Sequence, residues 1–296
     1  MPIAAIDLTT NQILAAILVD GPVVGLASHP TNGRLYAATG STNLDPKLCA
    51  IDTRSNTIVA TAQLERAGTN GLAVHPVGGR VYVSQDQKLL VFDAATLAPL
   101  ATITLPYGTR LSRPVLDRTG ARLYLLNADF DAAQLLVVDT ATNALSATLP
   151  LPARQVFNLA LSPDDRTLYV LTAGESRVMA IDTTTRAIVG DTLVGASSAT
   201  DPSHGIAGIA VHPNGSRLYV VNDVGTMSVL DTTTHRVVAT LLTQTATRGI
   251  AISADGSRLY GANSATNTFS VVDTNTNTIT ALVQADKSPL LVALVP

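Results

Sequence analysis

Short runs of apolar and β-branched residues alternate with clusters of turn-forming residues along the whole chain. The clearest stretch predicts four successive strands, at residues 208–212, 217–222, 226–230 and 236–241. Asn214 and Gly215 form a turn signal between the first two of these strands. No segment keeps the 3.6-residue period of an amphipathic helix. The pattern therefore predicts an all-β chain of short antiparallel strands.

Tyrosine marks an internal repeat. An Arg-x-Tyr triplet, with Thr in place of Arg in one copy, occurs six times, centred on Tyr36, Tyr82, Tyr124, Tyr169, Tyr219 and Tyr260. Successive copies are 41 to 50 residues apart, which is the length of one four-stranded propeller blade. The repeat therefore predicts six full blades.

An aspartate ends an apolar run seven times, and a hydroxyl residue follows three positions later. These aspartates are Asp7, Asp52, Asp93, Asp139, Asp182, Asp231 and Asp273. A carboxylate in this position accepts backbone N–H groups and forms an Asx-turn. Asparagine often comes next, and it tolerates a left-handed backbone. We interpret the repeated aspartates as turn formers and not as catalytic acids.

The two ends of the chain predict a seventh blade. Residues 3–8 and 12–19 match the third and fourth strands of the repeat, and residues 291–295 match its first strand. We therefore expect one domain over residues 1–296, a seven-bladed β-propeller whose closing blade combines residues 3–19 with 289–296. No second strand is available for that blade, so either it has three strands or the chain is trimmed.

Composition excludes several classes of function. The net charge is −3 and only three lysines occur, Lys47, Lys88 and Lys287, so the clustered basic residues needed for nucleic-acid binding are missing. Cys49 is the only cysteine, which rules out an intrachain disulfide. No apolar run reaches the roughly 18 to 20 residues of a membrane span, and the start shows no signal-peptide pattern. We expect a monomer, and a cytoplasmic location stays possible.

The chain resembles the YVTN-type β-propeller family. Residues 219–222 (Tyr-Val-Val-Asn) look like the tetrapeptide that names the family, and residues 229–232 (Val-Leu-Asp-Thr) look like its second signature. The resemblance covers the whole chain and implies a seven-bladed propeller of the lactonase-like superfamily with WD40-like blades. It also implies a periplasmic or extracellular location. The family includes proteins of unknown role, and its distant relatives include lactonases and lyases.

Three histidines share one repeat position, seven residues before the tyrosine: His29, His75 and His212. Three imidazoles suggest a metal site. Each, however, lies in the first hairpin turn of a different blade and is followed by proline. We expect these histidines to be structural, and we expect neither a metal nor a cofactor.

Candidate site residues lie where the repeat is broken. Residues 194–208 form the longest connection between blades and contain His204, a candidate general base. Six further residues belong to the same expected face and are candidate ligand-binding residues: Arg113, Asn158, Arg248, Asp131, Glu175 and Arg177. Such a cluster suits a small polar or anionic ligand. The alternative is a set of solvated loop charges that pair with one another.

Three functions are compatible with these residues. The first is a non-enzymatic binding or scaffold propeller that presents this face and its central channel to an unknown small ligand or protein. The second is an enzyme of lactonase or lyase type with His204 as the base. The third is a surface-associated module of a larger protein, which the threonine-rich composition permits. The chain has no nucleophile elbow, phosphate-binding loop or zinc-protease motif.

Overall fold

The structure is a computed structural model. It describes residues 2–40, 45–65, 68–77, 79–106, 110–128, 132–153, 155–172, 176–195, 208–221, 225–243, 247–285 and 289–295. The chain divides into two compact units, the first Met1–Leu151 with Ala293–Pro296 and the second Pro152–Val292. The single domain over residues 1–296 stays a prediction.

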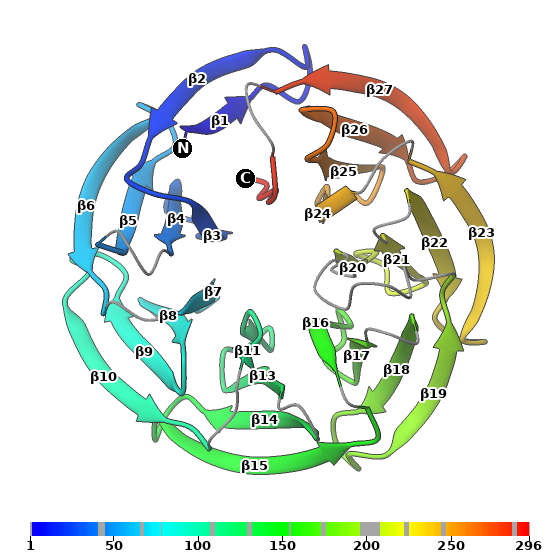
Figure 1. The fold of residues 1–296 in the computed structure, drawn as a ribbon, viewed down its shortest axis with the longest axis horizontal. Coiled ribbons are helices and arrows are strands. Elements are labelled where there is room, and N and C mark those ends of the chain that lie inside the picture. Colours follow the sequence, from blue (N-terminus) through cyan, green and yellow to red (C-terminus); the bar gives the residue numbers. More distant parts are fainter. Residues whose placement is uncertain are drawn as a thin grey trace. The chain divides into compact units, whose positions relative to one another are not determined.

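The first unit contains a two-stranded sheet and three larger antiparallel sheets (Figure 1). The two-stranded sheet pairs β1 (Pro2–Ile6) with β2 (Ile13–Leu18). The first blade is β3 (Val23–Ser28), β4 (Arg34–Thr39), β5 (Lys47–Asp52) and β6 (Thr57–Gln63). The second is β7 (Thr69–Val74), β8 (Arg80–Gln85), β9 (Lys88–Asp93) and β10 (Pro99–Thr104). The third is β11 (Arg110–Leu111), β12 (Val115–Leu116), β13 (Arg122–Ala128), β14 (Ala133–Asp139) and β15 (Ala144–Leu151).

The second unit contains three four-stranded antiparallel sheets. The fourth blade is β16 (Val156–Leu161), β17 (Thr167–Thr172), β18 (Arg177–Asp182) and β19 (Ile188–Leu193). The fifth is β20 (Ile209–Val211), β21 (Arg217–Val221), β22 (Thr226–Asp231) and β23 (Arg236–Leu242). The sixth is β24 (Thr247–Ile252), β25 (Arg258–Asn263), β26 (Thr268–Asp273) and β27 (Thr278–Gln284). We call the strands of each blade A to D in chain order.

The core lies between neighbouring blades. Strands B and C are apolar on both faces, so within each unit a blade is buried against the next. Tyr36, Tyr82 and Tyr219, which are repeat tyrosines on strand B, are fully buried at 0% exposure. Tyr36 of the first blade belongs to one apolar cluster with Leu72 and Phe92 of the second. The repeated Tyr is therefore a core residue in these blades, as its place in every copy indicates.

The described residues form six complete blades and one two-stranded sheet, so the seventh blade of the predicted propeller is not shown. Strands β1 and β2 lie where the third and fourth strands of a closing blade were expected. Residues 289–295, predicted to supply its first strand, are described and form no strand. Strand A of every complete blade bonds to strand B, and the described residues supply no strand B for the β1–β2 sheet.

The segment near the C-terminus nevertheless lies against the last blade. A Cβ added at Gly249 of β24 would lie 2.6 Å from the carbonyl oxygen of Leu290. In the first unit Ala293 packs against the apolar cluster that contains Ile3 and Ile17. In the second unit the Leu290 backbone thus packs on β24 as a neighbouring strand A would, although residues 289–295 form no strand.

The A–B and C–D turns form what we call the turn end of a blade. In all seven C–D turns the aspartate Oδ1 accepts the backbone N–H three residues later, at 2.6 to 3.0 Å. The residue after that has a left-handed backbone each time: Asn11, Asn56, Leu97, Asn143, Arg186, His235 and Asn277. These backbone bonds are the main cause that lowers the pKa of the seven carboxyls. The turn-forming role of the repeated aspartates is confirmed.

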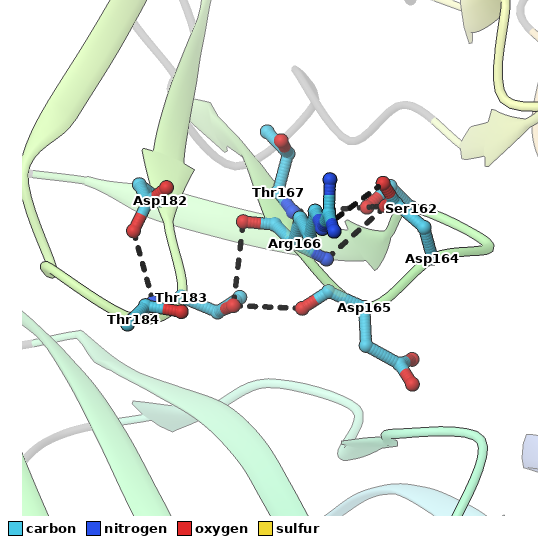
Figure 2. Close-up of polar contacts among 8 residues, drawn as sticks. All are labelled: Ser162, Asp164, Asp165, Arg166, Thr167, Asp182, Thr183 and Thr184. Carbon is cyan, nitrogen blue, oxygen red and sulfur yellow. Dashed lines mark hydrogen bonds and ion pairs between the residues drawn. The ribbon is translucent and has the colours of Figure 1, made fainter.

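The two turns of a blade also bond to each other, as the fourth blade shows (Figure 2). Thr183 follows the turn aspartate, and its hydroxyl donates to the Asp165 carbonyl oxygen in the A–B turn at 2.7 Å. The Ser162 hydroxyl accepts the Thr167 N–H at 2.9 Å and donates to Asp164 at 2.6 Å. The polar side chains of this end are engaged within the blade.

Further bonds at the turn end join neighbouring blades. Arg34 on β4 donates to the carbonyl oxygens of Ala94 and Ala95 in the next blade's C–D turn, at 3.1 and 2.8 Å. The Tyr36 hydroxyl donates to the same Ala94 oxygen at 2.6 Å. Arg80 bonds to the Thr140 carbonyl at 2.7 Å in the same manner. The repeated Arg thus fixes one blade to the next and is not available as an anion site in these copies.

Candidate functional site

The D–A and B–C connections lie at the opposite end of the blades, which we call the loop end. Strand A enters each blade from this end, and its ladder to strand B is irregular in most blades. The register shifts at Val23/Gly25, Thr69/Gly71, Val156/Asn158 and Thr247/Ile250. In the third blade strand A is split into β11 and β12. Bulges of this kind re-aim side chains and occur often near functional sites.

A glycine position in strand A controls how closely neighbouring blades approach. The residue four positions before the A–B turn cap is Gly25, Gly71, Gly208 or Gly249 in four blades. A Cβ on Gly25 would lie 2.9 Å from the Leu72 backbone nitrogen, so a side chain there would collide with the neighbouring strand. The two remaining blades carry Arg113 and Asn158 at this position. Two blades therefore depart from the repeat at the strand A position where neighbouring blades approach most closely.

Arg113 lies in the gap between β11 and β12, directly against Gly71 of the preceding blade. A Cβ on Gly71 would lie 2.8 Å from Arg113 Cγ and 2.9 Å from its Cα and Cβ. The gap is held by two serines. Ser84 Oγ donates to the Ser112 carbonyl oxygen at 2.9 Å, and Ser112 Oγ accepts the Leu126 N–H at 2.8 Å. The strand interruption is thus a bonded feature that positions Arg113.

The guanidinium of Arg113 has no partner among the described residues. Its Nε is fully buried and makes no hydrogen bond, although the residue as a whole is partly buried. Burial lowers the pKa of this guanidinium below its ordinary value. A buried charge is costly unless another charge or a hydrogen bond compensates it, so among the described residues of the site this cation is uncompensated.

The other candidate residues are less exposed to a common ligand than the sequence suggested. Arg177 Nε is paired with Asp191 of strand D in its own blade, at 2.7 Å. Asn158 Oδ1 accepts the N–H of the adjacent Leu159 at 3.0 Å. Arg248 is partly buried and lies in the irregular part of β24. Arg113 belongs to the first unit and Arg248 to the second.

Three of the seven predicted site residues lie outside the described residues. They are His204, Asp131 and Glu175. The catalytic role expected for His204 therefore stays a prediction.

The three repeat histidines serve as turn caps. Nδ1 accepts a backbone N–H from Thr31 in the case of His29, from Val77 for His75 and from Asn214 for His212, each at 3.2 Å. The His75 ring also occupies the space beside Gly120, where a Cβ would lie 2.1 Å from Nε2. At the same repeat position of the fourth blade, Ser162 Oγ instead accepts the N–H of Thr167, five residues later, at 2.9 Å. Across the described residues, no group of three His, Cys, Asp or Glu side chains is placed to hold a metal ion.

Sequence reasoning missed the supporting residues of Arg113, namely Gly71, Ser84 and Ser112. A signal for the first was present, because Gly71 and Arg113 occupy the same repeat position in adjacent blades. The serines carry no such signal, since their contacts arise from the split of strand A.

Comparison with known proteins identifies the fold of the chain but not its family. No protein-family profile matches the chain, and no curated protein does. A solved structure, "Kuenenia stuttgartiensis Hydrazine Synthase", is similar with a TM-score of 0.78 and 16% identity, over 92% of this chain and 89% of that one. The fold is a β-propeller. At this identity the likeness shows the fold alone, and the YVTN type is not confirmed. The described residues contain no helix, hence none able to cross a membrane.

Proposed function

We propose that this β-propeller is a non-enzymatic binding protein that holds a small polar ligand at its loop end. The observation that carries the proposal is Arg113, a buried cation without a partner among the described residues, at a position that is glycine in four other blades. Binding sites tend to lie where a regular scaffold is interrupted. Function by fold alone would be a weak inference, because propellers host many functions.

The division of polar groups between the two ends supports the choice of face. At the turn end the aspartates, threonines and several arginines already bond within the blade or to the next blade. At the loop end, two unlike residues replace the repeat glycine. At one of them, Arg113, a buried Nε–H has no hydrogen-bond partner and is available to an incoming ligand.

We also propose the finer architecture as a seven-bladed, YVTN-type propeller with a closing blade from both ends of the chain. Support comes from the Asp7 turn, which repeats the geometry of the other six with Asn11 in the left-handed position. Leu290 supplies further support, since its backbone packs on Gly249 as Leu72 does on Gly25.

The test is a thermal-shift screen of a mixed library of neutral and charged small molecules. Wild type is compared with three loop-end variants, Arg113→Gln, Asn158→Ala and Arg248→Gln, and with the exposed turn-end control Arg54→Gln. We expect compounds that stabilise wild type and the control, and that lose their effect in at least one loop-end variant. Compounds that stabilise all five proteins equally would contradict a loop-end site.

The lyase or lactonase alternative is tested separately. A panel of lactones and small esters incubated with the protein is followed for product. Turnover that His204→Ala abolishes would replace the binding role with an enzymatic one.

A further inference from the structure

We infer that Arg113 recognises the carboxylate of a small monoanionic ligand, with Gly71 providing the clearance that its side chain needs. The inference rests on the proposed loop-end binding function and names its ligand class. It draws on three properties of the site: a held side-chain stem, an uncompensated charge and the pairing of both loop-end lysines of the first unit with carboxylates.

The stem of Arg113 is held before any ligand arrives. Its Cα, Cβ and Cγ all lie within 2.9 Å of the point where a Gly71 Cβ would be. Ser112 binds the backbone on either side, through Leu126 and through the Arg113 carbonyl oxygen at 3.0 Å. A side chain held by its neighbours loses less conformational freedom when it binds.

The charge of Arg113 is not balanced inside the described part of the first unit. Asp20 pairs with Lys47 at 2.7 Å and Glu65 with Lys88 at 2.6 Å. The repeated aspartates accept hydrogen bonds within their own turns. Burial of Nε without a partner therefore favours an anion brought from outside, since buried unsatisfied donors are rare in native proteins.

The chemistry of the site favours a carboxylate. The guanidinium presents parallel N–H groups that match the two oxygens of a carboxylate. One positive charge balances a monoanion, whereas a phosphate dianion needs a second cation. At the loop end of the first unit, Lys47 and Lys88 are already paired with Asp20 and Glu65. The hydroxyl of Ser84 is also used, so the ligand is small and held mainly by its charge.

The experiment is a titration of the full chain with sodium acetate and sodium propionate, read by thermal shift and by isothermal calorimetry. Sodium chloride keeps ionic strength constant, and acetamide and phosphate are the comparison ligands. We expect saturable stabilisation by the carboxylates and none by acetamide. Arg113→Gln should abolish the effect, while Arg54→Gln, which removes the same charge from an exposed turn, should keep it.

Two further variants sharpen the result. Arg113→Lys keeps the charge but loses the planar donor pair, so the apparent Kd for acetate should rise at least tenfold. Gly71→Ala leaves the charge intact and displaces the stem, and it should also weaken binding. Without ligand, Arg113→Gln should melt at the same temperature as wild type or higher, because it removes an uncompensated buried charge.

Three results would overturn the inference. They are an unchanged acetate response in Arg113→Gln, a stronger response to phosphate than to carboxylates, and a lower melting temperature of ligand-free Arg113→Gln. The last would show that Arg113 has an internal partner, such as Asp131. If carboxylates fail while neutral compounds from the screen still depend on Asn158 or Arg248, the inference fails and the proposed binding function stands.

Discussion

The two ends of the blades use polar residues in opposite ways. At the turn end, side chains of Asp, Thr, Ser and His repeat from blade to blade, and each of these repeats accepts or donates a bond to nearby backbone. At the loop end the repeat keeps glycine and lets two blades depart from it, with Arg113 and Asn158. Regular chemistry thus marks structure in this molecule, and departures from it mark the candidate site.

The difference between the two ends predicts two kinds of mutational effect, one on stability and one on ligand binding. Substitutions at the turn end should lower stability, because they remove hydrogen bonds that hold hairpins and join blades. Substitutions of loop-end side chains should change binding with little effect on stability. Substitutions of the strand A glycines at the loop end should also lower stability, because neighbouring strands pack there too closely to accept a side chain.

The largest effect is expected at Gly25. Gly25→Ala places a Cβ 2.9 Å from the Leu72 nitrogen and 3.1 Å from the Gly71 carbonyl carbon, both rigid backbone. Overpacking of this kind costs about 1–3 kcal/mol. The matched control is Gly79→Ala, where no atom lies within 4 Å, and its effect should stay within about 0.5 kcal/mol. Chemical denaturation measures both, and equal midpoints would disprove the close approach of β3 and β7.

A matched tyrosine pair tests the bonds between blades. The buried hydroxyl of Tyr36 donates to Ala94 at 2.6 Å, whereas the buried hydroxyl of Tyr82 has no partner. Tyr36→Phe should therefore lower the free energy of unfolding by about 0.5–1.5 kcal/mol. Tyr82→Phe should leave it unchanged or raise it. A Tyr82→Phe variant that loses as much stability as Tyr36→Phe would show that the two positions are equivalent.

The histidine caps predict how stability changes with pH. Burial is the main cause that lowers the pKa of His29 and His75 below the ordinary 6.5. Their Nδ1 atoms accept backbone N–H groups, which protonation would prevent. The unfolded chain then takes up protons first, so this stability is present above pH 6.5 and is lost as the pH falls through the lower folded pKa values.

The measurement is the midpoint of urea unfolding between pH 7.5 and 5. The double variant His29→Ser and His75→Ser copies the serine that caps the same turn at Ser162 and Ser253. It should be less stable than wild type at neutral pH and should depend less on pH in this range. A slope equal to that of wild type would assign the pH dependence to other groups.

The regular part of the fold could be predicted from the sequence, because each repeated residue has the same structural role in every copy. Strands predicted at 217–222 and 226–230 appear as β21 and β22 with nearly the same bounds. The repeated Asp and the Asn after it gave the turn geometry directly, because both effects are local. The structure of the closing blade could not be predicted, because the match of residues 289–296 to strand A does not show whether they can pair when strand B is missing.

The candidate site was predicted only in part, for a physical reason. Side-chain pairing depends on which strands lie together, and the sequence alone did not show that Arg177 bonds to Asp191 across its own blade. Arg113 was predicted as a departure from the repeat, and its burial and the lack of a partner for Nε came from the structure. Aligning the repeats on the recurring glycine position of strand A would have identified Arg113 and Asn158 as the two exceptions.

The smallest effect concerns the left-handed residue of the C–D turn. Arg186 adopts φ 62° where four other blades or sheets have Asn11, Asn56, Asn143 or Asn277. Asparagine tolerates this backbone better than other non-glycine residues, so Arg186→Asn should raise the free energy of unfolding by about 0.3–1 kcal/mol. Arg186→Gln removes the same charge and should give no gain, while Asn56→Ala should lower stability. Equal stability of Arg186→Asn and Arg186→Gln would show that backbone strain at the turn end does not limit stability.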